Sequence, residues 1–218
     1  ITKKRDVLII NSEECHNPIA PYDLVKTMRA SFYVLGPLLS RFHYSEVSLP
    51  GGCAWGPRPV DFHIKALREM NVNISLDSGN IVAKGQPTGN KIVFKKKSVG
   101  ATGNVLMAAA GAIGKTEIIN AAKEPEIVAL GDFINNLGAN IEGLGTDNVH
   151  ITPINMNHPS SQKRVSISHK IIPDRIEAGT FLIAVAATGG KVEIKNVNTN
   201  HLKIVIDYLK MIGVSIEI

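Results

Sequence analysis

The sequence predicts an α/β protein built from repeated βαβαββ units around buried helices. Three short segments carry this prediction, because each ends a helix-like stretch and opens a strand-like one: Met70–Ile74, Leu137–Ile141 and Ile212–Ile216. They begin at residues 70, 137 and 212, so they lie 67 and 75 residues apart. Because such self-similarity is typical of repeated structural units, we expect a unit of about 70 residues.

Each copy contains the same elements in the same order. An apolar helix rich in small residues comes first, over Met28–Phe42, Thr102–Ile113 and Gly179–Thr188. A short strand of β-branched and apolar residues follows, over Val47–Leu49, Thr116–Ile119 and Val192–Ile194. A second helix then precedes the repeated segment, over Pro59–Met70, Pro125–Leu137 and Thr199–Ile212. Turns such as 77–80 and 146–148 lead to a further strand.

The two kinds of helix differ in their expected surroundings. The small residues of Ala108–Gly111 and Ala184–Ala187 carry no charge and allow close approach of other backbones. We therefore expect the small-residue helices to be buried on all sides. The second helices are amphipathic, so we expect them to form an outer layer against the sheets.

Both ends of the chain have the pattern of a strand. The chain starts at Ile1, without a methionine, and continues into the strand-like stretch Arg5–Ile10. It stops at Ile216–Ile218, where apolar and charged residues alternate. Because domains seldom begin and end inside strands, we expect a piece of a longer protein.

Composition excludes several classes of protein. The chain has 218 residues, a formal net charge of +5, 44% hydrophobic residues and 5% aromatic residues. This apolar content argues against disorder, and two cysteines cannot form a disulfide scaffold of this size. The longest apolar stretches, Val105–Ile113 and Phe181–Ala187, fall far short of the ~20 residues that cross a bilayer. No basic stripe interleaved with aromatic residues indicates nucleic-acid binding. We expect a cytoplasmic globular protein with one or two domains.

The copies differ most in the loop between the short strand and the second helix. In the first copy this loop has nine residues, Pro50–Arg58, against five in Asn120–Glu124 and four in Lys195–Asn198. It holds three glycines, the only tryptophan and a cysteine. Long loops on a rigid scaffold are common places for chemistry. The first-copy loop is therefore the first candidate site.

Cys53 and Arg58 are the candidate reactive residues of this loop. Arg58 precedes Pro59, which suits the first position of a helix, so Arg58 lies where a helix start favours an anion. The same helix start and Arg58 would lower the pKa of the Cys53 thiol. The alternative is that Cys53 is a small buried apolar residue. Cys15 has no comparable setting, and we expect it to be inert.

Two further segments could bind an anion. Lys96, Lys97, Ser98 and Val99 open directly into a small-residue helix, where amides and lysines could hold a phosphate. The alternative for Ser98 is a simple N-cap. Arg29 lies early in the first small-residue helix, where its charge opposes the macrodipole, so either a bound anion or a structural ion pair would explain it. Histidines and cysteines show no metal-ligand spacing, and we expect no metal and no cofactor.

Several of these residues occur together in a known family. The stretches Ala20–Ser31, Val47–Cys53 and Gly56–His63 resemble those of the UDP-N-acetylglucosamine 1-carboxyvinyltransferases, the enolpyruvyl transferases that commit this nucleotide sugar to peptidoglycan synthesis. The match extends to three more stretches and covers essentially the whole chain: Ser98–Thr102, Ala122–Val128 and Pro173–Phe181.

The resemblance implies a fold and a reaction. The fold would be the enolpyruvyl transferase-like inside-out α/β barrel, in which each domain has three βαβαββ units around buried helices. The reaction would transfer the enolpyruvyl group of phosphoenolpyruvate to the 3′-hydroxyl of UDP-N-acetylglucosamine and release phosphate through a tetrahedral ketal, with no metal. It would serve cell-wall growth, cell shape and cell division, and no obligate protein partner is implied.

The resemblance also implies roles for particular residues. Cys53 would be the loop thiol that donates a proton and reacts with fosfomycin, and Arg58 would hold phosphoenolpyruvate. Other residues would contact the nucleotide sugar: Arg29, Pro59, Val60, Asp61, Phe62, Lys96, Lys97, Ser98 and Val99. Both substrates are anionic, which suits arginine side chains and helix starts.

The sequence also departs from the family pattern. The N-terminal Lys-Asn pair, the aspartate taken as general base and the later arginines that close the cleft have no counterpart here. By resemblance, residues 1–172 are most of the cysteine-loop domain and residues 173–218 are the beginning of a second, similar domain. We therefore expect this chain by itself to turn over little or nothing. Trp55 and Pro57 replace an aliphatic and a small residue of the loop, which bears on the loop's motion.

Two other functions compete with this one. The shikimate-pathway enolpyruvyl transferases share the fold but do not use a Pro-Gly-Gly-Cys loop. A non-catalytic repeat domain that binds a nucleotide sugar or a protein partner is the other alternative. The long loop around Cys53 argues against it, because a purely structural repeat has no reason to lengthen one copy. Faster thiol labelling of Cys53 than of Cys15 would separate the two.

Overall fold

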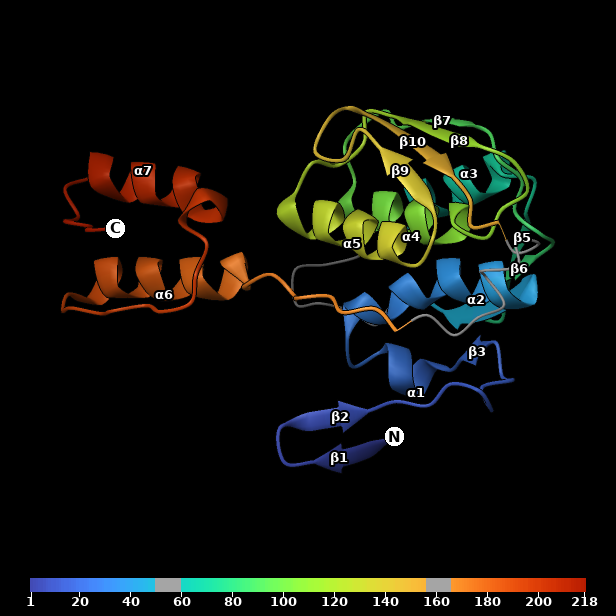
Figure 1. Ribbon diagram of the computed structural model, residues 1–218, viewed down its shortest axis with the longest axis horizontal. Helices are drawn as coiled ribbons and strands as arrows, with labels where there is room; N and C mark the ends of the chain where they lie inside the picture. Colours follow the sequence, from blue (N-terminus) through green and yellow to red (C-terminus); the bar gives the residue numbers. More distant parts are fainter. Residues whose placement is uncertain (50–59, 156–165) are drawn as a thin grey trace.

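The computed structural model describes residues 1–49, 60–155 and 166–218 (Figure 1). Its strands are β1 (Thr2–Lys4), β2 (Val7–Ile9), β3 (Ile19–Ala20), β4 (Tyr44–Ser48), β5 (Asn73–Asp77), β6 (Asn80–Lys84), β7 (Lys91–Val93), β8 (Thr116–Ile119), β9 (Asn140–Glu142) and β10 (Asn148–Thr152). Its helices are α1 (Tyr22–Val25), the 3₁₀ helix η1 (Arg29–Val34), α2 (Leu35–Phe42), α3 (Asp61–Glu69), α4 (Val99–Ala109), α5 (Pro125–Asn136), α6 (Arg175–Thr188), the 3₁₀ helix η2 (Thr199–Leu202) and α7 (Lys203–Met211).

Two four-stranded sheets confirm the predicted repeat for the first two copies. The first has the order β3-β4-β6-β5 and the second the order β7-β8-β10-β9. In each sheet the first two strands are parallel and the other pairs are antiparallel. Each sheet therefore forms from one βαβαββ unit, and the two units have the same topology. The predicted strand Thr116–Ile119 is found with these bounds as β8.

The two four-stranded sheets and the helices packed against them form the main body of the structure, and α4 lies at its centre. The burial of α4 confirms the prediction that the small-residue helix of the second copy is buried. Eight of its residues are buried, among them Thr102 and Asn104. It packs between α2 and the second sheet (Figure 1). A Cβ at Gly36 of α2 would lie 2.5 Å from the backbone oxygen of Asn104, so α2 approaches α4 at backbone distance. Small residues at this crossing make the close packing possible.

The three repeated segments all end a helix in the same way. Asn71, Gly138 and Gly213 follow the last helical turns with φ values of 61°, 104° and 97°. A left-handed residue just after the last turn is a common helix terminus, and it redirects the chain. In the first two copies the chain then enters β5 and β9.

The third copy forms its helices but not its predicted strands. Residues Val192–Ile194 and Ile216–Ile218 are not strands, so both predictions are wrong for this structure. The prediction that Ala184–Ala187 is buried on all sides is also wrong, because Ala184 and Ala187 are exposed. Strands need hydrogen-bonding partners, and a helix is buried only where other elements cover it. In the described residues, α6 packs mainly against η2 and α7, over a small cluster of Ala178, Leu202 and Ile206, and an ion pair links it to α5.

The chain's first residues form a hairpin outside the main body. Strands β1 and β2 pair antiparallel through a turn in which Arg5 has a φ of 51°. The apolar side chains from Val7 to Ile10 are exposed. The predicted strand in Arg5–Ile10 is therefore present as β2, but it pairs with β1 and not with either large sheet.

Candidate functional site

The start of α3 carries the first group of candidate residues. Val60 is the N-cap and offers no side-chain hydrogen bond to the helix, and Asp61 and Phe62 occupy the first turn. Asp61 is exposed, while Phe62 is half-buried. Cys53, Arg58 and Pro59 lie outside the described residues. The backbone of Arg29 begins η1, and its side chain lies outside the described part of the chain.

The start of α4 carries the second group. Ser98 is the N-cap and accepts a hydrogen bond from the amide of Ala101 at 3.3 Å, so the capping role considered for it is present. Lys95, Lys96 and Lys97 precede it and are exposed. Within the described ranges, neither Lys95 nor Lys96 takes part in an ion pair, so both ammonium groups can meet an anion.

Lys97 is used differently from its neighbours. Its Nζ donates to Asp147, to Asn120 Oδ1 at 3.1 Å and to the backbone oxygen of Ala121 at 3.3 Å. Asp147 also accepts from Lys123 at 2.7 Å. These two lysines hold the pKa of the Asp147 carboxyl below its usual range, Lys123 contributing most. Lys97 is therefore already paired within the protein, and its contacts link the starts of α4 and α5.

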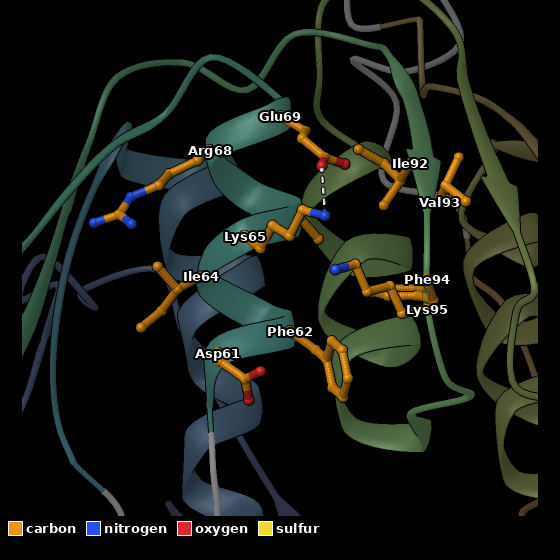
Figure 2. Close-up of a pocket in the computed structure, with 11 residues that line it drawn as sticks. Asp61, Phe62, Ile64, Lys65, Arg68, Glu69, Ile92, Val93, Phe94 and Lys95 are labelled. Carbon is orange, nitrogen blue, oxygen red and sulfur yellow. Dashed lines mark ion pairs between the residues drawn. The ribbon is translucent and has the colours of Figure 1, made fainter.

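One ring contact and a cavity bring the first two groups together. The rings of Phe62 and Phe94 pack edge to face, with centroids 6.4 Å apart and planes at 84°. Beside this contact is a cavity of about 450 Å³ between α3 and β7. Figure 2 shows Phe62, Lys65 and Glu69 on the side of α3 that faces β7. The residues that line the cavity are Asp61, Phe62, Ile64, Lys65, Ala66, Arg68, Glu69, Ile92, Val93, Phe94 and Lys95.

Three basic side chains, Lys65, Arg68 and Lys95, and two acidic ones, Asp61 and Glu69, line this cavity. Lys65 pairs with Glu69 at 3.6 Å, and Arg68 donates to the backbone oxygen of Ile74 at 2.8 Å. Lys95 enters from the β7 side (Figure 2). An aromatic wall and an ammonium group beside a helix start suit a ligand with a planar ring and an anionic group.

Behind both helix starts is a buried junction that sequence reasoning missed. Asn104 is fully buried in α4 and contacts the 3₁₀ helix η1, α2 and α3 through hydrogen bonds. Its Nδ2 lies 2.8 Å from Nδ1 of His63, which follows Phe62 in α3. The signal was present, because Asn104 is an amide residue inside a helix of mostly small and apolar residues.

Comparison with known proteins identifies the family. The family model for EPSP synthase (3-phosphoshikimate 1-carboxyvinyltransferase) matches residues 1–218, the whole chain. The chain belongs to this family.

Curated proteins of one name resemble the chain closely. UDP-N-acetylglucosamine 1-carboxyvinyltransferase from Campylobacter hominis is 49% identical over 97% of this chain and 49% of its own length. The protein of the same name from Actinobacillus succinogenes is 46% identical over 97% of the chain and 49% of its length. The chain therefore spans about half the length of the curated relatives it matches.

Solved structures confirm the predicted fold class. The enolpyruvyl transferase NikO from Streptomyces tendae matches with a TM-score of 0.68 and 21% identity, over 93% of this chain and 48% of that one. EPSP synthase from Acinetobacter baumannii matches with a TM-score of 0.60 and 20% identity, over 84% of this chain and 41% of that one. The fold is thus the enolpyruvyl transferase-like inside-out α/β barrel, of which the two βαβαββ units form a part.

The described residues of this EPSP synthase family member show neither a metal site nor a membrane-spanning helix. In residues 1–49, 60–155 and 166–218, histidine, cysteine and acidic side chains form no group of three that could hold a metal ion. None of the helices in the described part of the chain has the length and apolar character that a membrane crossing needs.

Proposed function

We propose that this chain forms about half of a UDP-N-acetylglucosamine 1-carboxyvinyltransferase. The observation that carries the proposal is the likeness to relatives of that name, 45–49% identical over nearly the whole chain. The complete enzyme would move the enolpyruvyl group of phosphoenolpyruvate to the 3′-hydroxyl of UDP-N-acetylglucosamine and release phosphate. It would act in the cytoplasm at the first committed step of peptidoglycan synthesis, which serves cell shape and division.

The nucleotide sugar would bind across the starts of α3 and α4. The contact between Phe62 and Phe94 supports this, because it joins the two candidate segments at one place. The ammonium groups of Lys95 and Lys96 are available to the diphosphate, and the first turn of α4 favours an anion. Val60, Asp61 and Phe62 would contact the uridine, and Ser98 and Val99 the diphosphate. Arg29 would reach the ligand from the start of η1.

The chemical step would use the long loop of the first copy. The oxygen of the sugar 3′-hydroxyl forms a bond to C2 of phosphoenolpyruvate while Cys53 gives a proton to C3. The hydroxyl proton goes to a base from the part of the enzyme beyond this chain. The resulting ketal then returns a proton from C3 to the Cys53 thiolate as the bond between C2 and the phosphate oxygen breaks and phosphate leaves. Arg58 would hold the phosphate and carboxylate charges throughout.

The domain division belongs to the same proposal. Residues 1–172 would form most of one domain, and residues 173–218 would begin a second, similar one. Separate buried clusters support this division, since the main core runs from Val25 to Ile151 and a small one contains Ala178, Leu202 and Ile206. One ion pair, between Arg175 and Glu126 at 2.9 Å, joins α6 to α5. We expect the isolated chain to have little or no activity.

Phosphate release from phosphoenolpyruvate tests the proposed function. The complete enzyme should release phosphate with UDP-N-acetylglucosamine and not with shikimate 3-phosphate. Cys53→Ser should lower kcat about 10²- to 10⁴-fold, the usual contribution of a general acid. Cys15→Ser is the matched control, because Cys15 is exposed and should leave kcat unchanged. Phosphate release with shikimate 3-phosphate alone would assign the chain to the shikimate-pathway enolpyruvyl transferases. Phosphate release with neither acceptor would leave only a binding function.

Fosfomycin gives a second readout for the same thiol. The complete enzyme should lose activity on incubation with fosfomycin, because the epoxide would alkylate the Cys53 thiolate. The Cys53→Ser variant should show no covalent adduct by mass spectrometry, whereas Cys15→Ser should show one. An adduct that persists in Cys53→Ser would place the reactive thiol elsewhere.

A further inference from the structure

The buried junction around Asn104 connects every element that carries a described candidate residue. Asn104 Oδ1 accepts from the amide of Gly36 at 2.9 Å. Its Nδ2 donates to the backbone oxygen of Phe32 in η1 at 3.2 Å, and the same nitrogen lies 2.8 Å from Nδ1 of His63 in α3. Both side chains are nearly inaccessible, with 0% of Asn104 and 6% of His63 exposed. A buried network of this kind is costly unless each member is satisfied.

The backbone partners fix the orientation of the Asn104 amide. A backbone amide can only donate and a backbone oxygen can only accept, so Oδ1 must face Gly36 and Nδ2 must face Phe32. The second hydrogen of Nδ2 is then directed at His63. Nδ1 of His63 must accept this hydrogen bond and is therefore unprotonated. In a neutral imidazole the proton then lies on Nε2.

The surroundings of the imidazole hold it against the start of α4. Its ring packs edge to face on Phe32, with centroids 5.0 Å apart. A Cβ at Gly100 would lie 3.0 Å from both Nε2 and Cε1 of His63, so the ring fills the space beside the first turn of α4. A movement of His63 would therefore disturb the starts of α3 and α4 together.

We propose that Asn104 is a positioning residue of the candidate site, which holds His63 as the Nε2–H tautomer and thereby aligns the first turns of α3 and α4. It acts through His63 and does not touch substrate. Its effect on substrate binding rests on the proposed function, because it concerns the segments Val60–Phe62 and Lys96–Val99. The assignment of the His63 tautomer does not depend on the proposed function.

Nitrogen NMR of the histidines tests the tautomer directly. In the complete enzyme labelled with ¹⁵N at histidine, His63 should give the signals of an unprotonated Nδ1 and a protonated Nε2. In Asn104→Asp the new carboxylate can only accept, so Nδ1 of His63 should become protonated. Asn135→Asp is the matched control, because Asn135 also bonds a backbone amide and a backbone oxygen, those of Ile141, but lies in α5. A protonated Nδ1 in the unsubstituted enzyme would overturn the proposal, whether or not any variant folds.

Steady-state kinetics tests the positioning role. We expect Asn104→Asp to raise KM for UDP-N-acetylglucosamine at least tenfold with kcat changed less than about threefold, since the nucleotide segments lose alignment. A merely structural loss would lower the amount of folded enzyme, and so apparent kcat, without changing KM. His63→Asn should restore most of the affinity that His63→Leu loses, because its amide oxygen can still accept from Asn104. Equal KM values in these two variants would overturn the role of this hydrogen bond. An unsubstituted enzyme without transfer activity would instead refute the proposed function, and the tautomer would still be read from the spectrum.

Discussion

Gly36→Ala is the substitution whose outcome depends most directly on how α2 crosses α4. Propensity alone favours alanine over glycine inside a helix by about 1 kcal/mol. The added Cβ would, however, lie 2.5 Å from the backbone oxygen of Asn104 and 2.9 Å from its Oδ1. Ordinary contacts begin at 3.4 Å, so the two helices would have to separate by about 0.9 Å, which a close-packed interior resists.

Two costs then exceed the gain in propensity. Overpacking of a core costs about 1–3 kcal/mol. Separation also breaks the buried hydrogen bond from Gly36 to Asn104, which leaves a buried polar group unsatisfied at a cost of about 1–3 kcal/mol. With the propensity gain of about 1 kcal/mol set against them, we expect Gly36→Ala to lower the free energy of unfolding by about 1–5 kcal/mol.

Urea denaturation of the 218-residue chain, followed by circular dichroism, measures this change. Gly179→Ala in α6 is the matched control, because the nearest atom to its added Cβ is a side-chain carbon of Leu202 at 3.5 Å, an ordinary contact. That variant should be unchanged or stabilised by up to about 1 kcal/mol. A Gly36→Ala chain as stable as the unsubstituted chain would refute the close crossing of α2 and α4.

Three further predictions concern charges and rings at the surface of the main body. Lys97→Met should raise the pKa of Asp147 toward its usual value, because one of the two lysines that lower this pKa is lost. A titration of the Asp147 carboxyl followed by ¹³C NMR measures the change, and an unchanged curve would contradict the ion pair between Lys97 and Asp147. Burial raises the pKa of Glu126, but the hydrogen bonds from Arg175, a backbone hydrogen bond and the charge of Arg175 together outweigh it, so the net pKa is lowered. The stabilisation from the Arg175–Glu126 pair is therefore present above the usual carboxyl pKa and is lost as the pH falls through the lowered pKa of Glu126. Arg175→Gln should abolish this pH dependence in thermal melts recorded from neutral to acidic pH. A pH dependence that persists in the variant would mean that other groups cause it. Phe62→Ala should lower the free energy of unfolding by about 2 kcal/mol in urea, since an aromatic contact and buried area are both lost, and no change would mean that the ring pair does not hold the two segments together.

Much of the main body could be predicted from the sequence, because its two units contain their own partners. The segments Met70–Ile74 and Leu137–Ile141 identified helix ends and strand starts, and both are found. The same pattern at Ile212–Ile216 predicted a strand that does not form. A periodic pattern reports which side chains are apolar, but not which element covers them or pairs with them. This is also why Ala184 and Ala187 are exposed despite the apolar composition of their helix.

The candidate site could be predicted only as separate segments. The sequence indicated the starts of α3 and α4, yet the contact between Phe62 and Phe94 depends on tertiary packing between residues far apart in the chain. The pairing of Lys97 with Asp147 is of the same kind, since the acidic partner comes from a turn near the end of the second unit. The histidines show no metal-ligand spacing, so the sequence by itself indicates no role for His63. Its link to Asn104 follows from the crossing of α3 and α4.

A crystal structure of the complete enzyme with UDP-N-acetylglucosamine tests the central claim most directly. The account predicts the uridine against Val60–Phe62 and the diphosphate at Lys96–Val99, with the sugar 3′-hydroxyl toward the loop that carries Cys53. Density for the nucleotide sugar at any other surface of the chain would contradict it.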